Sequence, residues 1–218
     1  MNTSILSELE STPYFTIEAV KQLHGENNNS VSTIRTAIYR WMKAGYILQL
    51  KNGVYMTRRF FDLHHADVNF APAVSAILIP QSYVSLDFIL QRSAILTEIT
   101  YPITAITIKH TRVIENKMGT FTFRNIKEEL YTGFTIMEYM GIPFAQARVS
   151  KALFDFLYLR PLYMDSRHST YNLADDLRLN LADWSEEKQD EFASFVTMSK
   201  SKKMDQVINN LRKTIWRH

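Results

Sequence analysis

A helical repeat followed at once by a hairpin signal, between residues 30 and 57, constrains the fold of this chain most. Residues 30–43 carry apolar side chains at i, i+4, i+7 and i+8, the spacing of a helix with one buried face: Ile34, Ile38, Trp41 and Met42. Ser30 or Ser32 is expected to cap that helix. Asn52-Gly53 then separates two β-prone runs, 46–50 and 54–56, which favours a tight β-hairpin.

Two shorter helical segments precede this pattern. Residues 3–11 form the first and residues 16–23 the second, with Pro13 between them and a polar turn predicted at 26–29. Three helices and a hairpin in this order predict a winged helix-turn-helix in residues 1–60.

The remaining residues, 61–218, show mixed patterns. Helices are expected at 71–78, 84–91, 148–159, 173–181, 185–198 and 203–216, and strands at 103–109, 112–115, 120–126 and 134–139. The expected fold class is therefore α+β: the winged helix-turn-helix followed by a second domain of helices around a small antiparallel sheet, with a helical C-terminus.

Charge is distributed unevenly along the chain. Between Asn27 and Phe61 there are six basic residues and no acidic one, and residues 199–218 hold six basic residues against one acidic residue. The stretch from Phe61 to Met198 has 12 basic and 17 acidic residues. Two basic ends around an acidic middle favour a polyanion-binding surface built from the ends.

A helix with a polar and basic outer face suits the major groove of DNA. On helix 30–43 this face is expected to carry base or phosphate contacts, and the hairpin and the residues after it are expected to contact the phosphate backbone. The predicted DNA-binding residues are Ser32, Arg35, Thr36, Tyr39, Lys43, Lys51, Asn52, Arg58 and Arg59. The alternatives are a merely solvated helix face and a winged helix that binds protein.

The basic tail allows two interpretations. Lys200, Lys202 and Lys203 could extend the contact with phosphates, or they could be a solvated run of charge, which we favour.

No catalytic, metal or cofactor motif stands out, and we expect a protein that is not an enzyme and needs no cofactor. The chain has no cysteine, six glycines, and no Walker, dinucleotide or nucleophile-elbow sequence. His64-His65 beside Asp62 and Asp67, and Asp175-Asp176 with Asp183, are carboxylate and imidazole groups that we interpret as solvated rather than as metal sites.

A cytoplasmic location is expected. No apolar run approaches the roughly 20 residues of a membrane helix, the first residues lack the pattern of a signal peptide, and the absence of cysteine fits a reducing compartment.

Lys151 and Asp155 stand four residues apart on the predicted helix 148–159. They could form a surface ion pair worth a few tenths of a kcal/mol, or a functional polar patch on an otherwise buried helix.

Three blocks in order resemble AbiEi-type antitoxins, a family of winged-helix regulators of type IV toxin–antitoxin systems. The blocks are residues 35–55, containing Arg-Thr-Ala-Ile-Tyr-Arg-Trp and Lys-Asn-Gly-Val-Tyr, residues 76–86, and residues 149–159, containing Lys-Ala-Leu-Phe-Asp. The resemblance as a whole covers roughly residues 12–163. Val149 and Ser150 depart from the Pro-Glu that commonly opens the third block, and the residues after Pro161 resemble nothing familiar.

The resemblance implies a repressor that binds inverted repeats in its own promoter as two copies. It also implies a C-terminal domain that counters a nucleotidyltransferase-like toxin without forming a stable complex, with Lys151 and Asp155 as the candidate patch for that function. Two other classes compete with this reading: a protein-interaction adaptor, and a metal-dependent nucleic-acid-processing enzyme.

Overall fold

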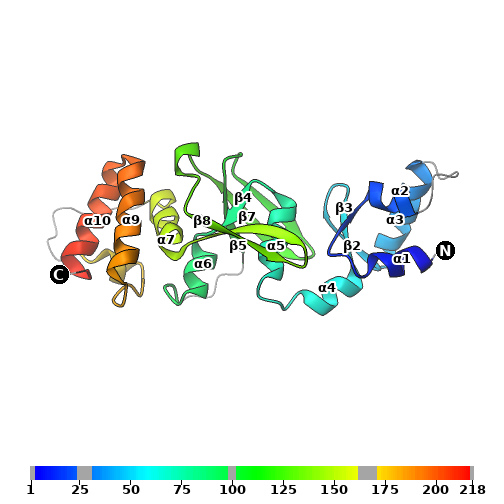
Figure 1. The fold of residues 1–218 in the computed structure, drawn as a ribbon, viewed down its shortest axis with the longest axis horizontal. Coiled ribbons are helices and arrows are strands. Elements are labelled where there is room, and N and C mark those ends of the chain that lie inside the picture. The colour runs from blue at the N-terminus through cyan, green and yellow to red at the C-terminus, as the bar shows by residue number, and fades with distance from the viewer. Residues whose placement is uncertain (1–2, 24–30, 98–101, 162–170, 217–218) are drawn as a thin grey trace.

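The computed structural model describes residues 3–23, 31–97, 102–161 and 171–216, with side chains placed from Ile5 onward. The predicted turn at 26–29 and the alternative cap Ser30 lie outside the described residues. Figure 1 shows the elements following one another along the long axis, with the N-terminal helices at one end, a sheet in the middle, and the last two helices at the other end.

The N-terminal region, residues 3–57, combines three helices with a small sheet. Its elements are α1 (Thr3–Leu9), β1 (Phe15–Thr16), α2 (Ile17–Leu23), α3 (Val31–Lys43), β2 (Ile47–Lys51) and β3 (Val54–Thr57). The sheet is antiparallel with the order β1-β3-β2, so β1 adds a strand that the sequence analysis missed. Ile34, Ile38 and Trp41 of α3 pack with Val20 and Ile47 in one buried cluster, as the helical spacing predicts.

A six-stranded sheet forms the middle of the molecule. Its strands are β4 (Ser82–Val84), β5 (Ile103–Thr107), β6 (Arg112–Asn116), β7 (Gly119–Asn125), β8 (Phe134–Tyr139) and β9 (Ile142–Ala147), in the order β6-β7-β5-β4-β9-β8. The pairs β4·β9 and β5·β7 are parallel and the other three pairs are antiparallel. The prediction of a small antiparallel sheet was therefore wrong, although the broader α+β class holds.

Helices cover both faces of this sheet. Ala105 and Ile106 are neighbours on β5 and both are fully buried, which requires cover on each side because successive strand residues point to opposite faces. Ala105 packs in the cluster of α5 (Phe70–Leu78), and Ile106 packs in the cluster of α6 (Asp87–Arg92) and α7 (Val149–Leu159). The predicted helix 84–91 was wrong at its start, where β4 ends and Leu86 takes a positive φ of 60° before α6 begins.

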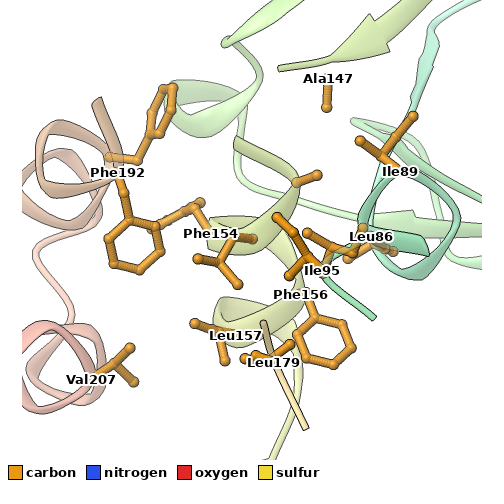
Figure 2. Packing of buried hydrophobic residues seen from close by; sticks show 14 of the residues in the cluster. Leu86, Ile89, Ile95, Ala147, Phe154, Phe156, Leu157, Leu179, Phe192 and Val207 are labelled. Atoms are coloured by element: carbon orange, nitrogen blue, oxygen red, sulfur yellow. The ribbon is translucent and has the colours of Figure 1, made fainter. Parts of the chain in front are cut away.

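The helical C-terminus is confirmed for the described residues. After η1 (Glu128–Leu130) and the last strands, α7 is followed by α8 (Leu173–Asp176), α9 (Glu186–Ser199) and α10 (Lys202–Thr214). Helix α8 is shorter than the predicted 173–181. Figure 2 shows α7 between the sheet side and the last helices, with Phe154 and Leu157 facing Phe192 and Val207.

Helix α4 (Arg58–His64) runs across the division predicted at residues 60 and 61. Leu50, Met56 and Phe60 pack with the α5 side of the sheet rather than with the core of α3. The N-terminal region and the sheet therefore share a buried cluster, and the two-domain division stays a prediction.

No helix within the described residues has both the length and the apolar composition needed to cross a membrane.

Candidate functional site

Helix α3 turns one polar face away from the buried cluster of the N-terminal region. Five predicted contact residues are exposed on it: Ser32, Arg35, Thr36, Tyr39 and Lys43. The largest of these side chains, Tyr39, is 60% exposed. Because Ile34, Ile38 and Trp41 anchor the opposite side in the core, the exposed face has a fixed orientation.

The cations of this face lie on the exposed side of α3. Within the part of the chain that the structure describes, Arg35, Arg40 and Lys43 take part in no ion pair. Arg40 was not among the predicted contact residues, although helical spacing alone places it one turn after Thr36. Thr36 Oγ1 donates a hydrogen bond to the Ser32 carbonyl at 2.9 Å, a local bond that uses the O–H and leaves the two lone pairs of the hydroxyl as acceptors.

The hairpin turn stands at the end of β2 and β3. Asn52 is exposed, and Gly53 has a φ of 76°, the left-handed conformation that the predicted Asn-Gly turn requires. The strand register shifts between Gln49 and Lys51. Such an irregularity re-aims side chains next to the turn.

Lys51 points away from this surface and into the body of the molecule. Its Nζ donates hydrogen bonds to the carbonyls of Ile77 and Leu78, at 2.6 and 3.1 Å, so it caps the C-terminus of α5. Burial, and secondarily Lys109, lowers the pKa of Lys51. The prediction of a phosphate contact for Lys51 does not fit this geometry, because the ammonium is already bound to the two carbonyl oxygens.

A second hydrogen bond fixes the hairpin on the sheet. Asn116 Nδ2, at the end of β6, donates to the Leu50 carbonyl at 3.0 Å. Together with Lys51 this bond holds β2 against both α5 and β6. These hydrogen bonds thus connect the hairpin to the six-stranded sheet and to α5.

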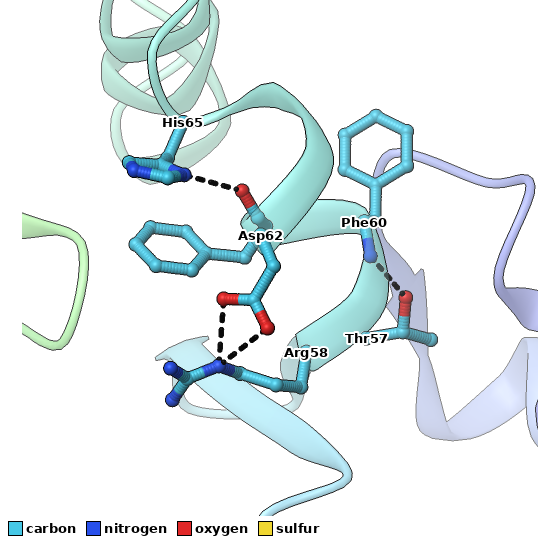
Figure 3. A network of polar contacts seen from close by, with 6 residues as sticks. Thr57, Arg58, Phe60, Asp62 and His65 are labelled. Carbon is cyan, nitrogen blue, oxygen red and sulfur yellow. Dashed lines mark hydrogen bonds and ion pairs between the residues drawn. The ribbon is translucent and has the colours of Figure 1, made fainter.

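Arg58 and Arg59 are exposed at the start of α4. Figure 3 shows Arg58 Nε against the carboxylate of Asp62, at 2.8 and 3.0 Å, and Thr57 capping the helix by accepting from Phe60 N. Arg59 Nη1 pairs with Glu10 at 2.7 Å. Exposed ion pairs of this kind contribute at most about 1 kcal/mol, so both arginines remain able to exchange a carboxylate for a phosphate.

The three lysines at the start of the basic tail differ in their surroundings. Lys203 Nζ donates to the carbonyls of Leu157, Tyr158 and Arg160, at the C-terminal end of α7, and burial lowers its pKa. Lys200 and Lys202 are exposed. Lys203 therefore holds α10 on α7 and does not belong to a free basic patch.

Lys151 and Asp155 form an ion pair in the interior. Both side chains are 0% exposed, so the expectation of a surface pair was wrong. The second Asp155 oxygen accepts from Ser85 Oγ at 2.7 Å and Tyr83 Oη at 3.0 Å. Four polar groups from β4, the segment after it and α7 thus satisfy one another.

The surroundings of this buried pair are apolar and close-fitting. The Lys151 ammonium lies 4.9 Å from the Phe154 ring centroid and 5.5 Å from that of Phe195. A Cβ added at Gly133, which has a φ of 79°, would come within 2.9 Å of the Lys151 side chain. Burial lowers the pKa of Lys151 and raises that of Asp155, and each charge opposes the shift of the other.

The acidic and histidine residues considered as metal ligands are dispersed. His64 pairs with Asp67 at 3.2 Å, whereas His65 Nδ1 contacts the Phe61 carbonyl at 3.0 Å. Asp175 accepts from Asn172 and Asp176 from Tyr171. Among the described residues no group of three or more His, Asp or Glu side chains is placed to hold a metal ion.

Comparison of the sequence with protein-family models and with curated proteins finds no match for this chain.

Proposed function

We propose that residues 3–57 form a winged helix-turn-helix that binds duplex DNA through α3. The observation that carries the proposal is the exposed face of α3, where Arg35, Arg40 and Lys43 have no ion pair within the described residues and the opposite side is anchored in the core. A rigid helix with free cations and short polar groups meets the requirements of a major-groove reader.

The contacts divide into base readout and positioning. Arg35 would pair with a guanine edge, with Thr36 and Tyr39 beside it, because an arginine fork matches the guanine O6 and N7 acceptors. Lys43 and Arg40 would meet phosphates on either side of the groove. Asn52 at the hairpin tip, and Arg58 and Arg59 after exchanging their carboxylate partners, would hold the backbone. Lys51 is left out of this interface.

The biological role that we propose is repression of the protein's own operon. This part of the proposal rests on the resemblance to AbiEi-type antitoxins, in which two copies bind an inverted repeat in the cytoplasm. For the antitoxin function, Lys151 and Asp155 would act through the packing of α7, because a fully buried pair cannot touch a toxin directly.

A fluorescence anisotropy titration tests DNA binding. The labelled duplexes are the region upstream of the protein's own gene and a random sequence of equal length, each at two salt concentrations. We expect tight, selective binding to the upstream duplex, weakening steeply with salt because several phosphate contacts release counterions.

Two outcomes would count against the proposal. Equal and weak binding to both duplexes would reduce the face of α3 to a general polyanion surface. Selective binding that persists unchanged after Arg35→Ala and Lys43→Ala together would place the DNA contact elsewhere, and the adaptor interpretation of the N-terminal region would then be favoured.

A further inference from the structure

The two edge strands of the six-stranded sheet, β6 and β8, differ in how they are protected. Strand β6 carries Arg112 and Glu115, and its last residue, Asn116, is hydrogen-bonded to the Leu50 carbonyl of β2. Charged side chains and covering contacts of this kind keep an edge strand from pairing with another chain. Strand β8 has six residues, among them no lysine, arginine or proline, and it pairs with β9 without a register shift. Apart from Glu138, β8 therefore lacks the features that protect an edge.

Every second residue of β8 turns its backbone N–H and C=O away from β9. In an antiparallel pair of strands, hydrogen-bonded and non-bonded residue pairs alternate. Arg148 N donates to the Gly133 carbonyl at 3.0 Å, which makes the odd-numbered residues of β8 the bonded ones. The register agrees, since Glu138 lies opposite Pro143, which has no N–H to donate. The even-numbered residues of β8 thus turn their backbone groups to the outer edge, where no strand pairs with β8 within the described residues.

The side chains along this edge are exposed and mostly apolar. The even-numbered residues are Phe134, Ile136 and Glu138. Ile136, the central one, is 68% exposed, more than any other large hydrophobic side chain of the described residues. Met137 beside it and Met140 in the turn after β8 are exposed as well. Single exposed apolar side chains are common, but a group of them next to an open strand edge indicates a binding surface.

These features are arranged symmetrically about Ile136. If a second copy of β8 lies antiparallel to the first with the two Ile136 residues opposite each other, Phe134 of each copy lies opposite Glu138 of the other. Each residue with outward-facing backbone groups then meets such a residue of the second copy, and each of these pairs exchanges two hydrogen bonds. The two Ile136 side chains cover each other at the centre. No other register pairs all three residues.

Charge favours the same register. Glu138 is the one charged residue of β8, and this pairing places it opposite the apolar Phe134 of the second copy. A shift of four residues would instead place the two Glu138 carboxylates opposite each other, where like charges repel. Backbone pairing, apolar cover and charge therefore agree on one arrangement of two identical strands.

We propose that β8 is a dimerisation surface, at which two copies of this chain join their sheets edge to edge with Ile136 on the two-fold axis. None of the DNA-contact residues proposed above lies on β8, so the pairing forms without DNA and does not rest on the proposed DNA binding. A single strand edge buries less than the roughly 1,200–2,000 Å² of standard interfaces, so we expect a weak dimer with a dissociation constant in the micromolar range.

Sedimentation velocity of the full chain, free of nucleic acid, tests the dimer from micromolar to millimolar concentration. We expect a monomer–dimer equilibrium. Ile136→Lys places two ammonium groups opposite each other and should raise the dissociation constant about tenfold or more. Val113→Lys is the matched control, because Val113 is 58% exposed on the other edge strand, β6. It should change the dissociation constant by less than about twofold, and both variants should keep the midpoint of urea unfolding.

Cysteine cross-linking tests the register, because the chain contains no cysteine of its own. In a hydrogen-bonded antiparallel pair the opposite Cα atoms are about 5.5 Å apart, which a disulfide can span. Mild oxidation with copper phenanthroline in air should therefore link Ile136→Cys into a covalent dimer. Glu138→Cys should not be linked, since its two cysteines would lie four residues, or about 13 Å, apart along the strands.

A chain that stays monomeric up to millimolar concentration would overturn the proposal and leave the edge for a strand of another protein. A dimer that Ile136→Lys leaves unchanged, or that Val113→Lys weakens equally, would place the contact elsewhere and overturn it too. Cross-linking of Glu138→Cys without cross-linking of Ile136→Cys would contradict the register about Ile136.

Discussion

The N-terminal region and the region around α7 use charged residues in opposite ways. On α3 the cations are exposed and unpaired within the described residues, whereas Lys151 and Asp155 are completely buried and bound to each other. Between these extremes, Lys51 and Lys203 each cap the C-terminus of a helix. A count of basic residues along the chain does not separate these roles, because the same ammonium group binds a phosphate when exposed and stabilises the fold when it meets carbonyls.

Breaking the buried pair should have the largest effect. Lys151→Met leaves the Asp155 carboxylate in the interior without its cation, which typically costs about 3–5 kcal/mol. Urea unfolding followed by circular dichroism measures the change. The double variant Lys151→Met, Asp155→Leu should recover part of that loss, although the hydroxyls of Tyr83 and Ser85 lose their acceptor. A loss below about 1 kcal/mol for the single variant would contradict the buried placement.

Changing α3 should affect recognition and leave stability alone. Arg35→Ala should reduce the discrimination between the upstream duplex and random DNA by about 1–3 kcal/mol if Arg35 reads a base. Its exposure means that unfolding should change by less than about 0.5 kcal/mol. An equal loss of affinity for both duplexes would instead assign Arg35 to a phosphate.

The sequence predicted this contrast only in part. The spacing of Ile34, Ile38 and Trp41 defined which face of α3 is buried, so the exposed face followed from local geometry. The roles of Lys51 and Lys203 did not follow, because their carbonyl partners lie 26 to 46 residues away in the chain. Only the tertiary packing brings these groups together.

The six-stranded sheet, too, could be predicted from the sequence only in part. Strands with strong β-branched patterns, such as 103–107, were predicted, whereas the three-residue β4 and the Pro-containing β9 were missed. Both missed strands lie in the middle of the sheet and pair in parallel, a contact that no local turn signal specifies. The burial of Asp155 beside Tyr83 and Ser85 depends on β4, so it could not be predicted either.

A smaller effect is expected for the capping lysine of the tail. Lys203→Met removes a charged donor from three carbonyls at the end of α7 and should lower the free energy of unfolding by about 1 kcal/mol, since the group is only partly buried. Lys202→Met is the matched control, because the neighbouring side chain is exposed. If the two variants lower the free energy of unfolding equally, in thermal or urea unfolding, Lys203 does not stabilise the fold by capping α7.

The smallest effect should come from Asp67, an exposed residue near the end of α4. Hydrogen bonds from Tyr139 and His64 lower the pKa of Asp67 below its ordinary value of 3.8. A carboxyl group whose pKa is lower in the folded protein than in the unfolded chain stabilises the fold at any pH above its unfolded-state pKa. This contribution is lost as the pH falls through the folded-state pKa. Asp67→Asn should therefore make the free energy of unfolding fall less steeply as the pH is lowered through the acid range. Tyr139→Phe should have the same effect to a smaller extent. An acid limb identical to that of the unchanged protein would show that these bonds contribute nothing.

The most direct test compares the salt dependence of DNA binding for two lysines, Lys43 on α3 and Lys51 on β2. Each is replaced by methionine, and the slope of log affinity against log salt is measured for the upstream duplex. If exposed cations bind DNA while capping cations hold the fold, Lys43→Met should reduce the slope by about 0.9 and Lys51→Met should leave it unchanged. A slope reduced by Lys51→Met and unaffected by Lys43→Met would contradict the account.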